Sequence, residues 1–238
     1  MDQFIRSEFL LGKENINKLK SCCVTIFGLG GVGSYVVEGL ARMGIGEFIL
    51  VDKDSVDLSN LNRQIIATHD TIGQDKVDIA KNRILSINPN AKVSVHKVFY
   101  LGNNEESLMK NSNYVVDAID TVTAKLSLVD YCYKNKIPVI SCMGTGNKLD
   151  PTSFMVSDIY KTSTCPFCRV MRRELKARNI PALKVVYSTE TPLKPNIPTK
   201  PSINPEAHVK QTPGSVSFVP SVAGLIIAGE VIKDLLNI

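Results

Sequence analysis

A glycine-rich turn between a predicted strand and a predicted helix constrains the fold of this chain more than any other feature. The stretch FGLGGVGSYVVEGL, residues 27–40, follows the buried strand pattern at 22–27 and opens a run of helical apolar spacing over 31–43. Glycines let the backbone approach a pyrophosphate closely, and the helix N-terminus offers free N–H groups to the anion. The pattern predicts a nucleotide site that is formed by Gly28, Gly30, Gly31 and Gly33.

An acidic residue follows at the distance that such a site requires. Asp52 ends the next strand pattern, EFILVD at 47–52, and lies 19 residues after Gly33. An acid at this place accepts hydrogen bonds from ribose hydroxyls. The glycine turn and Asp52 together remain compatible with NAD, FAD and ATP.

Strand and helix patterns alternate through the first part of the chain, which predicts a parallel sheet covered on both faces. We therefore expect an α/β fold with a Rossmann-like nucleotide-binding sheet in residues 1–150. Residues 151–238 form a smaller C-terminal extension, which is expected to face the substrate. Further strands are predicted at 91–96, 114–119, 137–143, 153–159 and 182–188, and helices at 75–87, 124–135, 166–178 and 221–236. The proline-rich stretch at about 190–212 predicts a long loop that is mobile or becomes ordered only on binding.

Polar residues beyond the ribose acid favour a triphosphate over a dinucleotide. Asn60, Asn62 and Arg63 lie in a short polar segment, and arginine offers planar bidentate donors to phosphate oxygens. Lys76 begins a predicted helix, where a cation is unfavourable unless an anion is bound nearby. The segment VVDAID places two carboxylates, Asp117 and Asp120, at the end of a strand, where open α/β sheets bind ligands and where a Mg²⁺ ligand is expected.

In this order, the motifs GLGGVG, VDKD, SNLNRQ, GQDK and DAID resemble the adenylating domain of the ThiF and MoeB family, over about residues 4–145. The resemblance implies that the glycine turn and Asp52 bind ATP and that Asp120 binds Mg²⁺. It implies a homodimer, in which Arg6 reaches the ATP of the partner subunit. It also implies phosphate contacts from Asn60, Arg63 and Lys76, and catalytic roles for Arg63, Lys76 and Asp120.

Longer stretches, among them NKIPVISCMGTGNKLDPT and DIYKTSTCPFCRVMRRELKARNI, resemble the TcdA-type tRNA threonylcarbamoyladenosine dehydratases of this family over nearly the whole chain. That resemblance implies ATP-dependent cyclisation of threonylcarbamoyladenosine in tRNA through an acyl-adenylate, with release of AMP and pyrophosphate. The alternative is adenylation of the C-terminus of a small ubiquitin-like sulfur carrier, with a sulfur-transfer or cysteine desulfurase system as partner. An NAD-dependent dehydrogenase and a non-catalytic ATP sensor also remain open.

The cysteines bear on this choice. The members of the family that activate sulfur carriers typically have two CxxC pairs that bind zinc. This chain has a single pair, Cys165 and Cys168. The pair is open to three interpretations: a zinc site with borrowed ligands, a redox pair, or two ordinary cysteines at the start of a helix.

Charge and composition indicate the partner and the compartment. The net charge is +5, and residues 161–210 contain ten lysines and arginines against three acids. Such a basic block suggests RNA as a partner, with a solvated surface as the alternative, and Arg172, Arg173, Lys176 and Arg178 share one predicted helix. We expect a cytoplasmic protein without a membrane partner, because no apolar run is long enough for a secretion signal or a membrane span.

Overall fold

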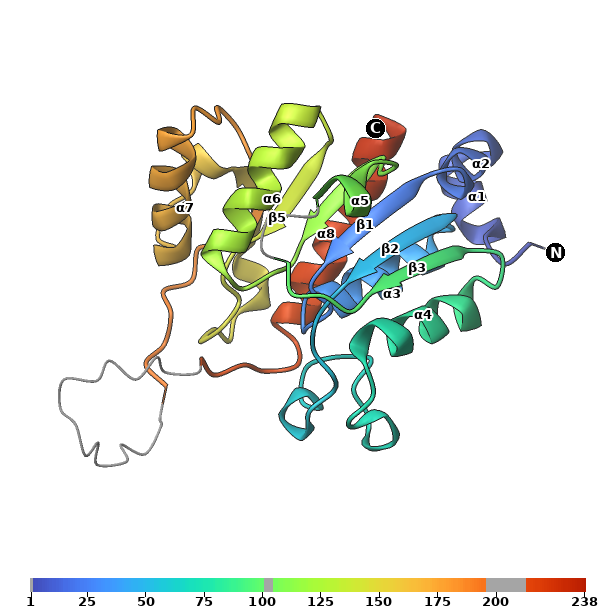
Figure 1. Cartoon of the computed structure of the whole chain (residues 1–238), viewed down its shortest axis with the longest axis horizontal. Helices are drawn as coiled ribbons and strands as arrows, with labels where there is room; N and C mark the ends of the chain where they lie inside the picture. The colour runs from blue at the N-terminus through green and yellow to red at the C-terminus, as the bar shows by residue number, and fades with distance from the viewer. Residues whose placement is uncertain (1, 101–104, 196–212) are drawn as a thin grey trace.

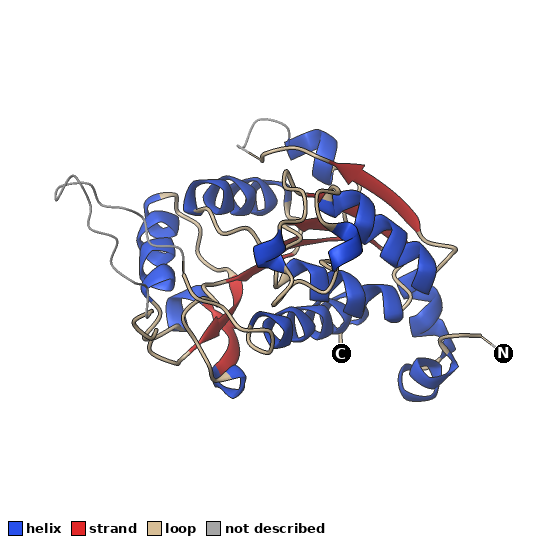
Figure 2. Cartoon of the chain, turned by 90° about the horizontal axis from the view of Figure 1, so that it is seen from below, coloured by secondary structure: helices blue, strands red, loops and turns tan. Residues whose placement is uncertain are grey.

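The computed structural model describes residues 2–100, 105–195 and 213–238 of the chain. In these residues one seven-stranded sheet has the order β3-β2-β1-β4-β5-β7-β6, and helices flank both of its faces (Figures 1 and 2). The strands are β1 Cys23–Phe27, β2 Glu47–Val51, β3 Lys92–His96, β4 Tyr114–Asp117, β5 Val139–Cys142, β6 Phe154–Asp158 and β7 Lys184–Ser188. The helices are α1 Ile5–Leu11, α2 Lys13–Lys20, α3 Gly33–Arg42, α4 Lys76–Ile87, α5 Glu105–Met109, α6 Val122–Asn135, α7 Pro166–Ala177 and α8 Pro220–Leu236.

Strand β1 shows how the sequence produces two covered faces. Its residues are buried throughout, and successive side chains of a strand point to opposite faces. Val24 and Ile26 pack in the core beneath α3, α4 and α8, whereas Cys23 and Phe27 pack in the core that includes residues of α5 and α6. The predicted α/β class with a mostly parallel, doubly covered sheet is confirmed.

The sheet has one antiparallel strand, β6, at its edge. Strand β6 pairs antiparallel with β7, while the other neighbouring strands pair in parallel. The chain passes from β5 to β6 through residues 143–153 without an α-helix, so β6 begins at the edge of the sheet where β5 ends and runs in the opposite direction. The predicted parallel sheet is confirmed for β1 to β5, and no orientation was predicted for the strands expected at 153–159 and 182–188.

The C-terminal part of the chain is built onto the same sheet. Strands β6 and β7 extend it beyond β5, and α8 packs against α3, β4, β5 and β7. The domain boundary at residue 150 stays a prediction. Most of the proline-rich stretch at about 190–212 lies outside the described residues, and its described part, 190–195, contains neither helix nor strand.

The order of the strands reverses between β1 and β4, since the chain moves outward to β2 and β3 on one side and to β5 on the other. Ligands of open α/β sheets bind outside the carboxyl ends of the strands at such a point. None of the helices in the described ranges is long and apolar enough to cross a membrane.

Candidate nucleotide-binding site

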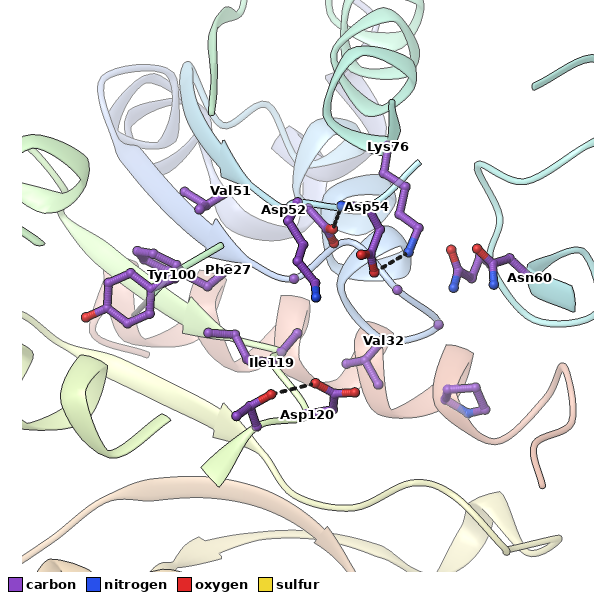
Figure 3. A pocket seen from close by; sticks show the side chains of 18 of the residues that line it. Phe27, Val32, Val51, Asp52, Asp54, Asn60, Lys76, Tyr100, Ile119 and Asp120 are labelled. Carbon is purple, nitrogen blue, oxygen red and sulfur yellow. Dashed lines mark hydrogen bonds and ion pairs between the residues drawn. The ribbon is translucent and has the colours of Figure 1, made fainter. Parts of the chain in front are cut away.

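A cavity of about 340 Å³ opens at the carboxyl ends of β1, β2 and β4, at the point where the strand order reverses (Figure 3). Its size lies in the range of small-molecule sites. Most of the residues predicted for a nucleotide site line it: Gly28, Gly30, Gly31, Asp52, Asn60, Arg63, Lys76 and Asp120. The structure thus brings together residues that lie more than ninety positions apart in the sequence.

The positions of the turn require glycine for different structural reasons. Gly28 has a φ of +86°, and a Cβ there would lie 2.7 Å from the carbonyl oxygen of Ala118. Gly33, which does not line the cavity, closes the turn, because its Cβ would lie 1.8 Å from the carbonyl oxygen of Gly28. Gly30 differs, since a Cβ there would meet only the distant side-chain nitrogen of Gln64, at 3.9 Å. Packing within the chain does not demand glycine at position 30, whereas a ligand lying against the loop would.

Asp52, the acid after β2, is hydrogen-bonded to the glycine turn. Its Oδ2 accepts a hydrogen bond from the Leu29 N–H at 2.6 Å, and its Oδ1 accepts one from the Asp54 N–H at 2.8 Å. Carboxylate oxygens accept more than one hydrogen bond, so both retain acceptor capacity toward the cavity. The predicted contact to ribose hydroxyls is compatible with this position.

Lys76 lies where the sequence predicts, at the first position of α4. It is only 5% exposed, and its Nζ lies 3.3 Å from Oδ2 of Asp54 (Figure 3). The Asp54 side chain is 52% exposed, so water shares its charge and the pair is a loose one. A buried ammonium with such a partner, at a helix N-terminus, is well placed for a bound anion.

Asn60 and Arg63 come from the polar segment after β2. Asn60 is buried, and its Oδ1 accepts from the Asp57 N–H at 3.2 Å in a capping box. Arg63 Nη1 donates to the carbonyl of Ser59 at 2.7 Å and to Oδ1 of Asn62 at 2.9 Å. Within the described ranges Arg63 forms no ion pair with an acid, so its charge faces the cavity without a carboxylate partner.

The two acids of the DAID segment have different environments. Asp120 is exposed, lines the cavity and accepts a hydrogen bond from the Thr121 hydroxyl at 3.2 Å, and none of the described cations lies within ion-pair distance of it. Asp117 is fully buried and forms an ion pair with Lys125 at 2.9 Å. The prediction that Asp117 faces the ligand was therefore wrong. Asp117 lies two residues after Val115 and shares its face of β4, which α6 covers, so its side chain points into the protein interior.

Arg6 lies outside the cavity of its own chain. It is an exposed residue of α1, which packs against α2 at some distance from the carboxyl ends of the strands (Figure 1). Its predicted role needs a second subunit, so it stays a prediction.

Cys165 and Cys168 are both buried at the start of α7. The Cys165 Sγ caps the helix by accepting from the Cys168 N–H at 3.5 Å. The pKa of Cys165 falls to about 6, because the thiol and the backbone N–H of Cys168 both donate to its sulfur, whereas the pKa of Cys168 is raised. The described residues contain no group of three or more His, Cys, Asp and Glu side chains that fits a metal. Cys165 thus caps α7, while a role of the pair in redox chemistry or in zinc binding with a second subunit stays a prediction.

Several residues of the site were not singled out from the sequence. Gln64 lines the cavity, and its Oε1 is buried without a hydrogen-bond partner among the described residues. Tyr100 packs edge-on against Phe27, with ring centroids 4.9 Å apart, on the wall beside β1. Thr145 follows β5 and lines the same cavity. An orphaned amide oxygen fits a ligand that donates to it, since such buried groups are normally satisfied.

The glycine turn, the acid after β2 and the cations at the carboxyl edge of a mostly parallel sheet define a nucleotide-binding α/β protein. The ThiF family model matches residues 4–238, and the chain belongs to the ThiF family.

Comparison with known proteins shows which members of the ThiF family this chain is similar to. The chain is 44% identical over 243 residues to a tRNA threonylcarbamoyladenosine dehydratase of Bacillus subtilis, covering 100% of this chain and 96% of that protein. It is 34% identical over 233 residues to the enzyme of the same description from Haemophilus influenzae, covering 94% and 89%. Its structure is similar to that of the E. coli dehydratase TcdA in complex with ATP, with a TM-score of 0.88, 31% identity, and coverage of 99% of this chain and 94% of that chain. A structure of the E. coli protein with AMP matches equally.

Proposed function

We propose that this protein is an ATP-dependent tRNA threonylcarbamoyladenosine dehydratase. The observation that carries the proposal is the coincidence of two facts. The chain is similar along its whole length to such dehydratases, and its cavity collects the glycine loop, the acid and the cations that a triphosphate needs. The orphaned oxygen of Gln64 and the open space at Gly30 support a nucleotide as the occupant.

ATP enters as a co-substrate. The threonyl carboxylate of the modified adenosine attacks the innermost phosphorus, which gives an acyl-adenylate and pyrophosphate. The neighbouring ureido group then displaces AMP and closes a five-membered ring, and the net change is loss of water. The carboxylate becomes a good electrophile only as the adenylate, and ring closure is fast because both reacting groups belong to one substrate.

Each polar residue of the cavity has a role in this reaction that follows from its charge. Asp52 holds the ribose, and Asn60 contacts a phosphate. Arg63 and Lys76 neutralise the negative charge that grows on the departing pyrophosphate, in a site from which water is partly excluded. Asp120, a carboxylate without a cationic partner in the described ranges, would hold Mg²⁺, which would supply further positive charge at the phosphates.

Helix α7 supports tRNA as the macromolecular partner. Arg173 and Lys176 are exposed on it, and the Arg173 side chain is 78% exposed beside Glu174. Arg172 is different, since its Nη1 donates to the carbonyl of Thr162 at 3.0 Å and it is half-buried. The basic surface that we propose for the RNA backbone consists of Arg169, Arg173, Lys176 and Arg178, without Arg172, and Glu174 within it forms ion pairs with Arg173 and Arg178.

A homodimer in the cytoplasm is also proposed. Helix α1 exposes Phe9 and Leu10, 74% and 85%, on the element that bears Arg6. Apolar side chains of this size are typical of surfaces that a second subunit covers, and Arg6 would then face the partner's nucleotide. The described surface gives no support for a sulfur-transfer partner, so the proposal does not include one.

The test offers ATP and tRNA that carries threonylcarbamoyladenosine, and measures the mass of the nucleoside after digestion. We expect the nucleoside to lose the mass of one water molecule, while AMP and pyrophosphate appear in equal amounts. The control is Asp120→Asn, which we expect to fold because the exposed Asp120 side chain bonds, among the described residues, only the Thr121 hydroxyl, and which we expect to leave the nucleoside unchanged. An unchanged nucleoside with folded, ATP-binding wild-type protein would contradict the proposal. Pyrophosphate exchange provoked by a ubiquitin-like carrier would then favour the sulfur-carrier alternative.

A further inference from the structure

A second cavity, of about 470 Å³, adjoins the nucleotide cavity. The two share Arg63, Asp120 and Thr145 among their lining residues, so an occupant of the second lies directly beside the phosphate-binding side chains. The rest of its wall comes from the loop after β5, from the start of α7 at Phe167, and from the segment at Gly214. These parts of the wall belong to the C-terminal half of the chain, and Val32 of the glycine loop also lines the cavity.

Lys125 lies at this cavity although it is only 1% exposed. Its Nζ forms an ion pair with Oδ2 of Asp117 at 2.9 Å and donates to the Ser141 hydroxyl at 3.1 Å and to the carbonyl of Cys142 at 2.7 Å. Its Nζ also lies 3.5 Å from the carbonyl oxygen of Asp117, so all three protons of the ammonium are directed at acceptors of the protein. The centroid of the Phe167 ring, which also lines the cavity, lies 5.9 Å from Nζ.

The acceptors of Lys125 join the structural elements that form both cavities. Asp117 ends β4, and its Oδ1 also accepts from the Ile119 N–H at 3.2 Å, which holds the turn that leads to Asp120. Ser141 and Cys142 end β5, and the loop that begins there lines the second cavity. One buried cation from α6 therefore fixes the distance between the Asp120 turn and the opposite wall.

A buried ion pair contributes little net free energy to the stability of a fold. Charges taken out of water lose hydration, and well-packed apolar residues of similar size often stabilise a fold as well or better. The pair of Lys125 and Asp117 lies at the ends of β4 and β5, where the loops that line the two cavities leave the sheet. Its position points to a role in the geometry of the site.

We propose that the second cavity receives the carboxylate-bearing side chain and base of the substrate nucleoside, and that Lys125 is the positioning residue that aligns this cavity with the nucleotide. The inference rests on the proposed function, which supplies the nucleoside. Lys125 acts through Asp117 and the β5 loop, since its own protons are committed. It affects where the carboxylate lies relative to the innermost phosphorus.

The test separates this role from neutralisation of a buried charge. Lys125→Met alone leaves Asp117 buried and unpaired, so it is expected to unfold. The double variant Lys125→Met with Asp117→Asn removes both charges and keeps similar volumes, and it is expected to fold. Lys125→Arg keeps the charge. Each protein is measured for its thermal midpoint, its affinity for ATP, and kcat and KM with the modified tRNA.

We expect the double variant to keep the affinity for ATP but to lose kcat/KM for the tRNA on the order of 100-fold, because misplacement of about 1 Å has effects of that size. Lys125→Arg is expected to recover much of the loss. A double variant with the kcat and KM of the wild type would overturn the inference, as would a parallel loss of ATP affinity and folding. Failure of the wild type itself to convert the nucleoside would instead overturn the proposed function, and this inference with it.

Discussion

Replacing Lys76 by methionine is expected to lower the rate of AMP formation by about 10²–10³, the usual cost of losing one preorganised charge at a developing anion. The side chain is 5% exposed and lines the nucleotide cavity, so water cannot replace the ammonium. The fold should survive, because the remaining partner, Asp54, is 52% exposed and stays solvated. Loss of a buried cation also removes its desolvation cost.

The measurement is single-turnover AMP release at saturating ATP, together with the thermal midpoint of unfolding. Lys81→Met is the matched control, since Lys81 lies on the same helix but does not line the cavity. We expect Lys81→Met to retain the wild-type rate. A Lys76→Met protein that is folded and releases AMP at the wild-type rate would remove Lys76 from the account.

Two glycine substitutions in one turn should give opposite results. Gly33→Ala is expected to destabilise or prevent folding, because its Cβ would lie 1.8 Å from the carbonyl oxygen of Gly28. Gly30→Ala should leave the thermal midpoint close to that of the wild type, since its Cβ would meet nothing closer than 3.9 Å. The same methyl group would occupy the space of the ligand, so we expect the affinity for ATP to fall on the order of tenfold or more.

Thermal unfolding and equilibrium binding of ATP distinguish the two effects. If Gly30→Ala bound ATP as tightly as the wild type, the nucleotide would not lie against the loop. If Gly33→Ala folded with the wild-type midpoint, the turn would be able to relax in a way that the described geometry does not suggest. Gly229→Ala is the comparison for an added methyl group alone, because a Cβ at Gly229 would meet nothing within 4 Å and Gly229 lies outside both cavities.

Much of the fold was predictable from periodicity. The buried strand patterns at 22–27 and 47–52 became β1 and β2, and the helical spacing at 75–87 became α4, because central strands and packed helices carry strong apolar signals. The first two helices, Ile5–Leu11 and Lys13–Lys20, were missed. The first is short and has no buried residue, and the second buries only Ile16 and Leu19, so neither produces a long apolar stripe.

The site was predictable where a residue type has few other uses at its place. Asp52, Lys76 and Asp120 follow strand ends or begin a helix, and all three line the cavity. Lys125 could not be found this way, because a lysine within a helix is ordinary and only the three-dimensional structure shows that Asp117 and Ser141 surround it. Pairing across the sheet, and not spacing along the chain, creates that cluster.

The central claim is that a carboxylate of the substrate attacks the innermost phosphorus of ATP in this cavity. It is tested most directly by placing heavy oxygen in the threonyl carboxylate of the modified tRNA and analysing the products by mass spectrometry. Attack at that phosphorus followed by ring closure predicts that one heavy oxygen atom passes to AMP, while pyrophosphate stays unlabelled. Label in inorganic phosphate together with ADP, or AMP free of label beside the cyclised nucleoside, would contradict it.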